Sequence, residues 1–186
     1  MSNRSLLGSS VIPLRLIFLM WLCFFLETNF GFFISQYGIT PRTLNGLAGI
    51  FLAPLIHGDL LHLLSNTLPL LFMGSLLFYF YSSIATNVFF RAYFWTNILV
   101  WLFARPANHI GASGVVYALA FFLIFFGLFR RDVLSILISI ITLILYGSVF
   151  YGVLPGDPFI SWESHFGGAL VGIGSAITFS KKKRIH

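Results

Sequence analysis

The chain has 186 residues, of which 58% are apolar and only 9% are charged. A soluble domain of this size needs more polar surface, and the mean hydropathy of +0.94 likewise indicates an integral membrane protein. The net charge of +6 does not indicate nucleic-acid binding, because several basic residues form the run KKKR at 181–184, which is typical of a topology anchor. The single cysteine, Cys23, cannot form an intrachain disulfide.

The apolar runs predict one helical bundle. About 20 apolar residues are needed to cross a hydrocarbon core, so a chain of this length holds roughly six spans with short loops. We therefore expect an all-α membrane protein in which residues 1–186 form a single domain. The first run is too long for a cleavable signal peptide and is expected to be retained. The predicted spans are residues 14–34, 60–80, 89–103, 113–129, 133–152 and 164–180.

The basic residues predict the orientation of the bundle. Most of them fall on one side of six spans, so the positive-inside rule places both termini in the cytoplasm. Arg42 and Arg105 fall on the other side and are outweighed. The outer side then carries three loops, near residues 36–59, 104–112 and 154–163. The residues on the inner side are Arg4 and Arg15 before the first span, Arg91 in the second connection, Arg130 and Arg131 in the fourth, and KKKR at the end.

Polar residues at membrane depth are costly and indicate functional positions. The first span contains Glu27, which we interpret as a structural hydrogen-bond partner. The second begins in HGDLLHLLSN, where His62 and Asn66 are four residues apart and share one helix face. His57 precedes His62 by five residues, and the sequence leaves open whether its role is structural or functional. His109, near the start of the fourth span, is predicted to be an interfacial residue.

The fourth and sixth spans begin with motifs of small residues. GASG, at 111–114, contains Ser113, and Tyr117 follows one turn later on the same face. Its glycines allow backbone N–H groups to point into a site at the positive end of a helix, which favours an anion. The sixth span begins in ESHFGGALVG, where Gly168 and Gly172 lie on the face of His165 and allow close helix packing.

These polar groups predict a serine nucleophile. Ser113, His165, His62 and Asn66 all lie near the starts of even-numbered spans, so they are expected at one depth near the outer surface. A serine hydroxyl needs a general base, and an imidazole is the usual one. His62 and Asn66 could donate hydrogen bonds to the resulting oxyanion. Because no carboxylate has a suitable position to complete a triad, the prediction is a Ser-His dyad.

HLLSN, GASG and HFGGALVG resemble the HxxxN, GxSG and HxxGxxxG motifs of rhomboid intramembrane serine proteases in their minimal six-helix form. The resemblance implies Ser113 as nucleophile, His165 as general base, and His62 and Asn66 as oxyanion donors. It further implies that Tyr117 supports the imidazole and that His57 lines the outer mouth of the site, with Gly111, Gly168 and Gly172 in supporting positions. The first outer loop lacks the Trp-Arg pair that many family members carry.

The expected reaction is cleavage of a peptide bond in or near a transmembrane segment of another membrane protein, without a cofactor or metal, in a bacterial plasma membrane. Three alternatives remain. A metal enzyme could use His57, His62 and His165, although HExxH is absent. A transporter could use the polar cluster as a relay, although no inverted repeat is apparent. An inactive rhomboid-like chain could bind client helices, although both Ser113 and His165 are present. No feature of the sequence indicates an oligomeric state.

Overall fold

The computed structural model describes residues 5–181, and within this range the regular structure is helical apart from one antiparallel bridge between Ile39 and His109. Arg4, His186 and the basic run beyond Lys181 lie outside the described residues. The elements in chain order are α1 (Leu6–Phe30), η1 (Ile34–Tyr37), α2 (Gly46–Leu52), η2 (Ala53–Leu55), α3 (Leu60–Phe80), α4 (Ser82–Phe103), α5 (Ser113–Arg130), α6 (Val133–Tyr146), α7 (Val149–Gly152) and α8 (Trp162–Ser180).

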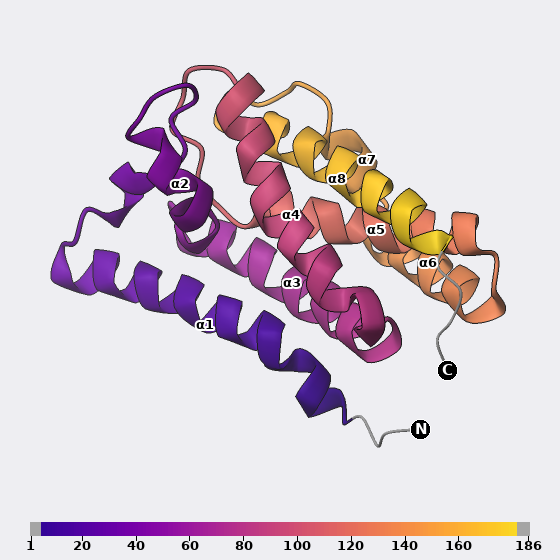
Figure 1. Cartoon of the computed structure of the whole chain (residues 1–186). Coiled ribbons are helices and arrows are strands. Elements are labelled where there is room, and N and C mark those ends of the chain that lie inside the picture. Colours follow the sequence, from indigo (N-terminus) through magenta and orange to yellow (C-terminus); the bar gives the residue numbers. More distant parts are fainter. Residues whose placement is uncertain (1–4, 182–186) are drawn as a thin grey trace.

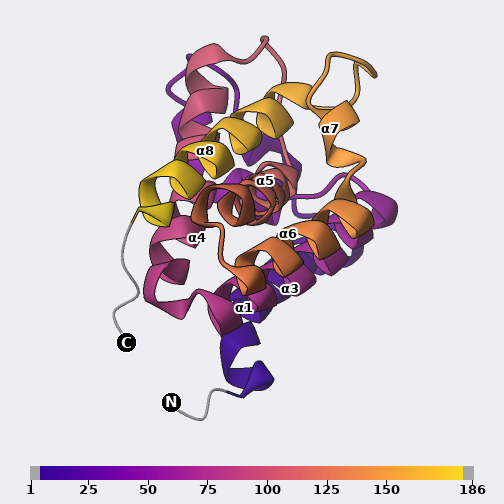
Figure 2. The same cartoon turned by 90° about the vertical axis from the view of Figure 1, so that its right-hand side faces the viewer.

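Helix α5 occupies the centre of the molecule. It packs against α3, α4, α6 and α8, most extensively against α8, and Figure 2 shows these four helices around it. Its sequence, SGVVYALAFFLIFFGLFR, is apolar on every face, as expected of a helix without a solvent-facing side. Leu119, Phe122, Leu123 and Phe126 are completely buried. The residue that begins this helix, Ser113, therefore lies at the end of the most enclosed element.

Carboxylate caps fix the starts of α3 and α6. The carboxylate of Asp59 accepts a hydrogen bond from the His62 N–H (2.8 Å) at the start of α3. Asp132 caps α6 through the Ser135 N–H (3.0 Å). These side chains satisfy N–H groups that have no partner within the helix. Burial raises the pKa of Asp132, but hydrogen bonds from Ser135 and Arg130 outweigh it and hold that pKa below its ordinary value.

Two basic residues lie inside helices rather than in the connections predicted for them. Because Ser5 caps α1, that helix begins before residue 14 and includes Arg15. Helix α4 begins at Ser82, directly after Tyr81, since the polar stretch SSIATN continues the helix instead of interrupting it. Arg91 is therefore within α4, and its guanidinium carbon lies 4.8 Å from the centre of the Phe179 ring. The predicted placement of Arg15 before the first span and of Arg91 in a connection was wrong.

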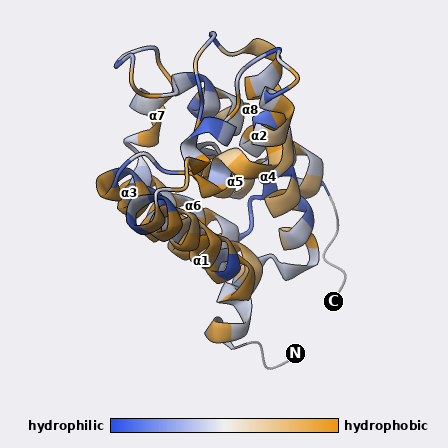
Figure 3. Ribbon diagram, turned by 90° about the vertical axis from the view of Figure 1, so that its left-hand side faces the viewer, coloured by the Kyte–Doolittle hydropathy of each residue, from blue (hydrophilic) through white to orange (hydrophobic). Residues whose placement is uncertain are grey.

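Several helices have the character of membrane spans. By length and hydropathy, Leu7–Phe30, Leu60–Phe80 and Ser113–Arg130 can each cross a membrane. Figure 3 shows apolar residues along α1, α3 and α6. The 14 residues of α6 extend only about 21 Å, and the chain bends at Gly147 and Ser148 before α7. The chain is thus a helical membrane protein, and its count of six spans stays a prediction.

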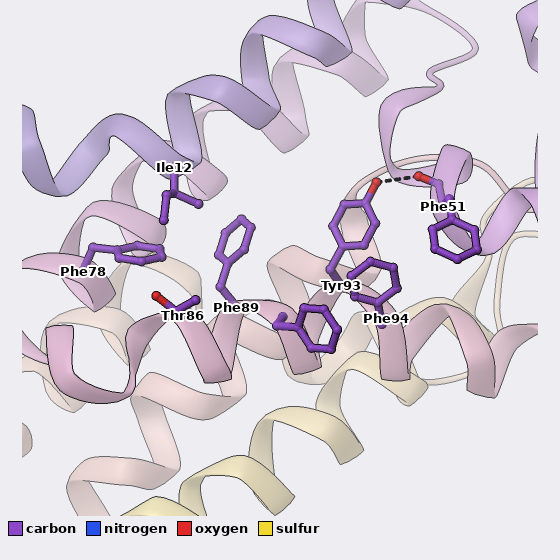
Figure 4. A pocket seen from close by; sticks show the side chains of 8 residues that line it. Ile12, Phe51, Phe78, Thr86, Phe89, Tyr93 and Phe94 are labelled. Atoms are coloured by element: carbon purple, nitrogen blue, oxygen red, sulfur yellow. Dashed lines mark hydrogen bonds between the residues drawn. The ribbon is translucent and has the colours of Figure 1, made fainter.

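An apolar groove of about 340 Å³ lies among α1, α2, α3 and α4 (Figure 4). The hydroxyl of Tyr93 donates a hydrogen bond to the Phe51 carbonyl (2.6 Å) at one end of this groove. The lining contains none of the residues predicted for the functional site. It consists of Ile12, Phe51, Phe78, Thr86, Phe89, Phe90, Tyr93 and Phe94.

Candidate active site

The starts of α3, α5 and α8 lie at the end of the bundle where the loops at 31–59, 104–112 and 153–161 gather (Figures 1 and 2). The start of α1 and the end of α8 both lie toward the opposite end of the molecule (Figure 1). The polar residues singled out in the sequence therefore belong to one region of the molecule, although they come from three helices.

The turn before Ser113 requires glycine. Gly111 has φ +107°, a conformation that side-chain-bearing residues rarely adopt, and a Cβ there would lie 2.5 Å from Nε2 of His62. The Gly111 N–H donates to the carbonyl of Ala53 (2.8 Å), which ties the turn to η2. The His62 imidazole thus lies directly against the backbone that leads into Ser113.

His57 supports the same turn, next to His62. Its side chain is only 2% exposed, and its Nε2 accepts a hydrogen bond from the Ala112 N–H (3.4 Å). The His57 and His62 rings meet edge to face with their centres 4.9 Å apart. Burial, and next the proximity of His62, lower the pKa of His57 to about 4. His57 is therefore a buried, neutral acceptor for the backbone next to Ser113.

Asn66 lies one turn after His62 and is 3% exposed. Its amide nitrogen donates to the His62 carbonyl (2.9 Å), within its own helix. An asparagine amide has two N–H donors, so one remains for another acceptor.

The environment of His165 determines which ring nitrogen carries the proton. Nδ1 lies 2.9 Å from the carbonyl oxygen of Gly152, the last residue of α7. A carbonyl can only accept, so Nδ1 must donate, and in the neutral ring Nε2 is left with a free lone pair. The imidazole stacks on the ring of Tyr117, with the centres 3.9 Å apart and the planes 5° from parallel.

The backbones of α5 and α8 are in direct contact next to this pair. A Cβ at Gly168 would overlap the Gly114 carbonyl oxygen, and one at Gly172 would overlap that of Ala118. Gly114 in turn faces α8, since a Cβ there would lie 3.2 Å from the Ser164 carbonyl oxygen. Small residues on both helices allow this approach, as is common between membrane helices.

Tyr117 shows how Ser113 and His165 lie relative to each other. Tyr117 lies one turn after Ser113 on the same face of α5, and the His165 ring stacks on it. Among the described residues, the Ser113 hydroxyl makes no hydrogen bond, and the His165 imidazole makes its one hydrogen bond through Nδ1. The imidazole therefore lies against the first turns of α5 with its basic nitrogen unoccupied.

His109 has a different role from the interfacial one predicted. It is 3% exposed, with Nδ1 2.6 Å from the Ser161 hydroxyl and Nε2 3.0 Å from the Arg105 carbonyl oxygen. Its backbone pairs with Ile39 in both directions (2.8 and 2.9 Å). The interfacial interpretation was wrong because two of these partners, Ile39 and Ser161, come from loops that are distant in the sequence and that a local reading does not bring together.

The nearby carboxylates have other partners. Oε1 of Glu163 lies 3.5 Å from Nε of Arg105, and Glu27 accepts a hydrogen bond from the Ser35 N–H (2.9 Å), as expected of a structural residue. Neither forms a hydrogen bond with His165. The groups that sequence reasoning missed at this site are the Gly152 carbonyl and the Ala112 N–H, both backbone groups without a side-chain signature.

Residues 45–182 match the rhomboid domain. The chain belongs to the rhomboid family. Three mycobacterial relatives support this placement. Uncharacterized proteins of Mycobacterium tuberculosis and Mycobacterium bovis are each 32% identical over 97% of this chain and 79% of their own length. An uncharacterized protein of Mycobacterium leprae is 33% identical over 81% of this chain and 63% of its own length. The rhomboid family includes intramembrane serine proteases, and these relatives are bacterial.

Proposed function

We propose that this rhomboid is an intramembrane serine endopeptidase that cleaves peptide bonds in or near transmembrane segments of other membrane proteins. The observation that carries the proposal is the state of His165, whose Nδ1 donates to Gly152 while Nε2 stays free beside the start of α5. A general base for a serine hydroxyl needs this arrangement.

In the proposed reaction, Ser113 Oγ attacks the carbonyl carbon of the scissile bond and its proton passes to Nε2 of His165. The resulting imidazolium gives this proton to the leaving amine as the C–N bond breaks, which leaves an acyl-enzyme at Ser113. Water then attacks the ester carbonyl and gives a proton to Nε2 of His165. The imidazolium passes this proton to Oγ of Ser113 as the acyl C–O bond breaks, which releases the peptide acid and restores the serine.

The oxyanion of the tetrahedral intermediate needs donors already in place. The N–H groups in the first turn of α5 have no acceptor within the helix, and the helix dipole adds positive potential there. His62, against Gly111, and the second amide hydrogen of Asn66 are the side-chain donors that we assign to the same oxyanion.

The decisive test uses the full chain in detergent. Ser113→Ala and His165→Ala should each abolish cleavage of a transmembrane substrate, and a fluorophosphonate should label the native chain but not Ser113→Ala. The matched control is Ser65→Ala, an exposed serine on α3, which should keep activity and labelling. Undiminished cleavage by Ser113→Ala would refute the proposal.

One observation favours the alternative of an inactive, client-binding rhomboid, namely the absence of a hydrogen bond to the Ser113 hydroxyl in the described structure. Catalytic hydrogen bonds are often long before substrate binds, so we prefer the protease. Failure of the folded native chain to react with the fluorophosphonate would favour the alternative.

We further propose a bacterial plasma membrane location with both chain ends cytoplasmic, which accessibility labelling of Lys181 in vesicles can test.

A further inference from the structure

Three elements hold the His165 imidazole. The imidazole belongs to α8, and Tyr117 of α5 covers one face of the ring. The Gly152 carbonyl of α7 accepts a hydrogen bond from Nδ1. The first two elements, α8 and α5, contain the sequence motifs around His165 and Ser113. The third is a helix of four residues that follows a bend in the chain and contains no residue of those motifs.

Helix α7 is seated on α5 immediately beside Tyr117. The rings of Phe150 and Phe121 lie 4.9 Å apart, and Phe121 is one turn after Tyr117 on α5. Val149 is buried in the same core cluster. These apolar contacts direct the last carbonyl of α7 toward the His165 ring.

Position 152 has no room for a side chain. A Cβ on Gly152 would overlap the hydroxyl oxygen of Tyr117 and lie 2.8 Å from Cζ and 3.3 Å from Cε1 of the same ring. Any larger residue must therefore displace the Tyr117 ring, on which the imidazole stacks, or move α7 and its carbonyl away from Nδ1. Either movement disturbs His165.

We infer that Gly152 is a positioning residue for the general base: the α7 carbonyl selects the Nδ1–H form of His165, and the missing side chain at 152 lets Tyr117 and this carbonyl contact the ring together. This inference rests on the proposed protease function. In a site without a carboxylate partner for the histidine, the carbonyl does the two tasks that such a carboxylate performs. It fixes the tautomer, and it lies next to the positive charge that forms on the imidazolium.

The test compares Gly152→Ala with Gly156→Ala, a loop glycine on the same connection that has no atom within 4 Å of an added Cβ. Because a misplacement of about 1 Å costs about 10²-fold in rate, we expect Gly152→Ala to lower kcat by about 10- to 100-fold with a smaller change in KM. Gly156→Ala should match the native chain.

A double variant separates positioning from general loss of structure. Tyr117→Phe removes the closest atom that an alanine at 152 would meet. The Gly152→Ala/Tyr117→Phe chain should therefore recover about 5- to 10-fold of the kcat that Gly152→Ala loses, since contacting residues couple in this way. A purely structural defect of α7 predicts no such recovery, and thermal unfolding of each variant in detergent shows whether the fold is intact.

The tautomer provides a readout that does not depend on activity. With ¹⁵N-labelled histidine, the His165 signal, assigned by its loss in His165→Gln, should show a protonated Nδ1 in the native chain and a mixture of tautomers in Gly152→Ala. An active, Ser113-dependent native chain with an unchanged tautomer and full kcat in Gly152→Ala would overturn this inference alone. Cleavage that is independent of Ser113 would instead overturn the proposed function.

Discussion

At the scale of single residues, the candidate site depends on two imidazoles, each of which makes one hydrogen bond to the backbone through one ring nitrogen. His57 accepts from the Ala112 N–H, and His165 donates to the Gly152 carbonyl. A protonated His57 would present an N–H to the Ala112 N–H in place of a lone pair. The shape of the turn before Ser113 therefore depends on the charge of His57, which lies outside the GASG motif.

This linkage predicts how stability depends on pH. The folded-state pKa of His57 is about 4, below its ordinary value, because of burial and then of His62; the Leu55 backbone and then Asp59 oppose this shift. Between about pH 6.5 and pH 4 the unfolded chain binds a proton that the folded chain does not, so stability falls as the pH is lowered through this range. At pH 5 the loss from this group is about 2 kcal/mol.

Unfolding of the native chain and of His57→Gln in detergent, compared at pH 7.5 and pH 5, measures this effect. The glutamine keeps a neutral acceptor, so His57→Gln should lose about 2 kcal/mol less than the native chain over this interval. Equal losses in the two chains would show that His57 does not titrate in this range.

The proposed oxyanion donors predict graded losses. Removal of one side-chain donor typically costs about 10² to 10³ in rate while backbone donors remain. His62→Ala and Asn66→Ala should each retain weak activity with fluorophosphonate labelling still detectable, in contrast to Ser113→Ala. Native turnover in both variants would exclude these residues from the mechanism.

At the scale of elements, the seam between α5 and α8 decides where His165 lies relative to Ser113. Gly168→Val would force Cβ into the Gly114 carbonyl, so the helices must separate. Activity should fall about 10²-fold and the thermal midpoint should drop, although no reacting group is removed.

Gly174→Val is the matched control for this seam. Gly174 is exposed on the same helix, and an added Cβ there meets no atom within 4 Å, so activity should be retained. Gly127, in the last turn of α5, is not suitable as a control, because it too faces another helix. A Cβ there would overlap the Ser135 carbonyl oxygen and lie 2.5 Å from Cβ of Ser139 on α6. Full activity of Gly168→Val would mean that the α5–α8 contact does not position the dyad.

At the scale of the whole molecule, sequence reasoning succeeded where a side chain carries the signal. The apolar runs indicated a helical membrane protein, and GASG with HFGGALVG indicated the rhomboid family. It failed where tertiary contacts decide the outcome. His109 is buried by loops distant in sequence, and Arg91 lies within α4 because packing overrides the polar residues that precede it. The Gly152 carbonyl could not be predicted, since every residue has one.

The order of these contacts along the chain has a consequence for biosynthesis. In the turn before Ser113, the backbone N–H groups donate hydrogen bonds to Ala53 and His57. A ribosome synthesises both of these residues before it reaches the turn. The proposed base arrives last, because Gly152 and then His165 follow α6. A nascent chain that has inserted α1 to α6 thus contains the serine without its base. Under the proposed dyad mechanism, the protein therefore cannot cleave neighbouring membrane proteins until α8 has entered the bilayer.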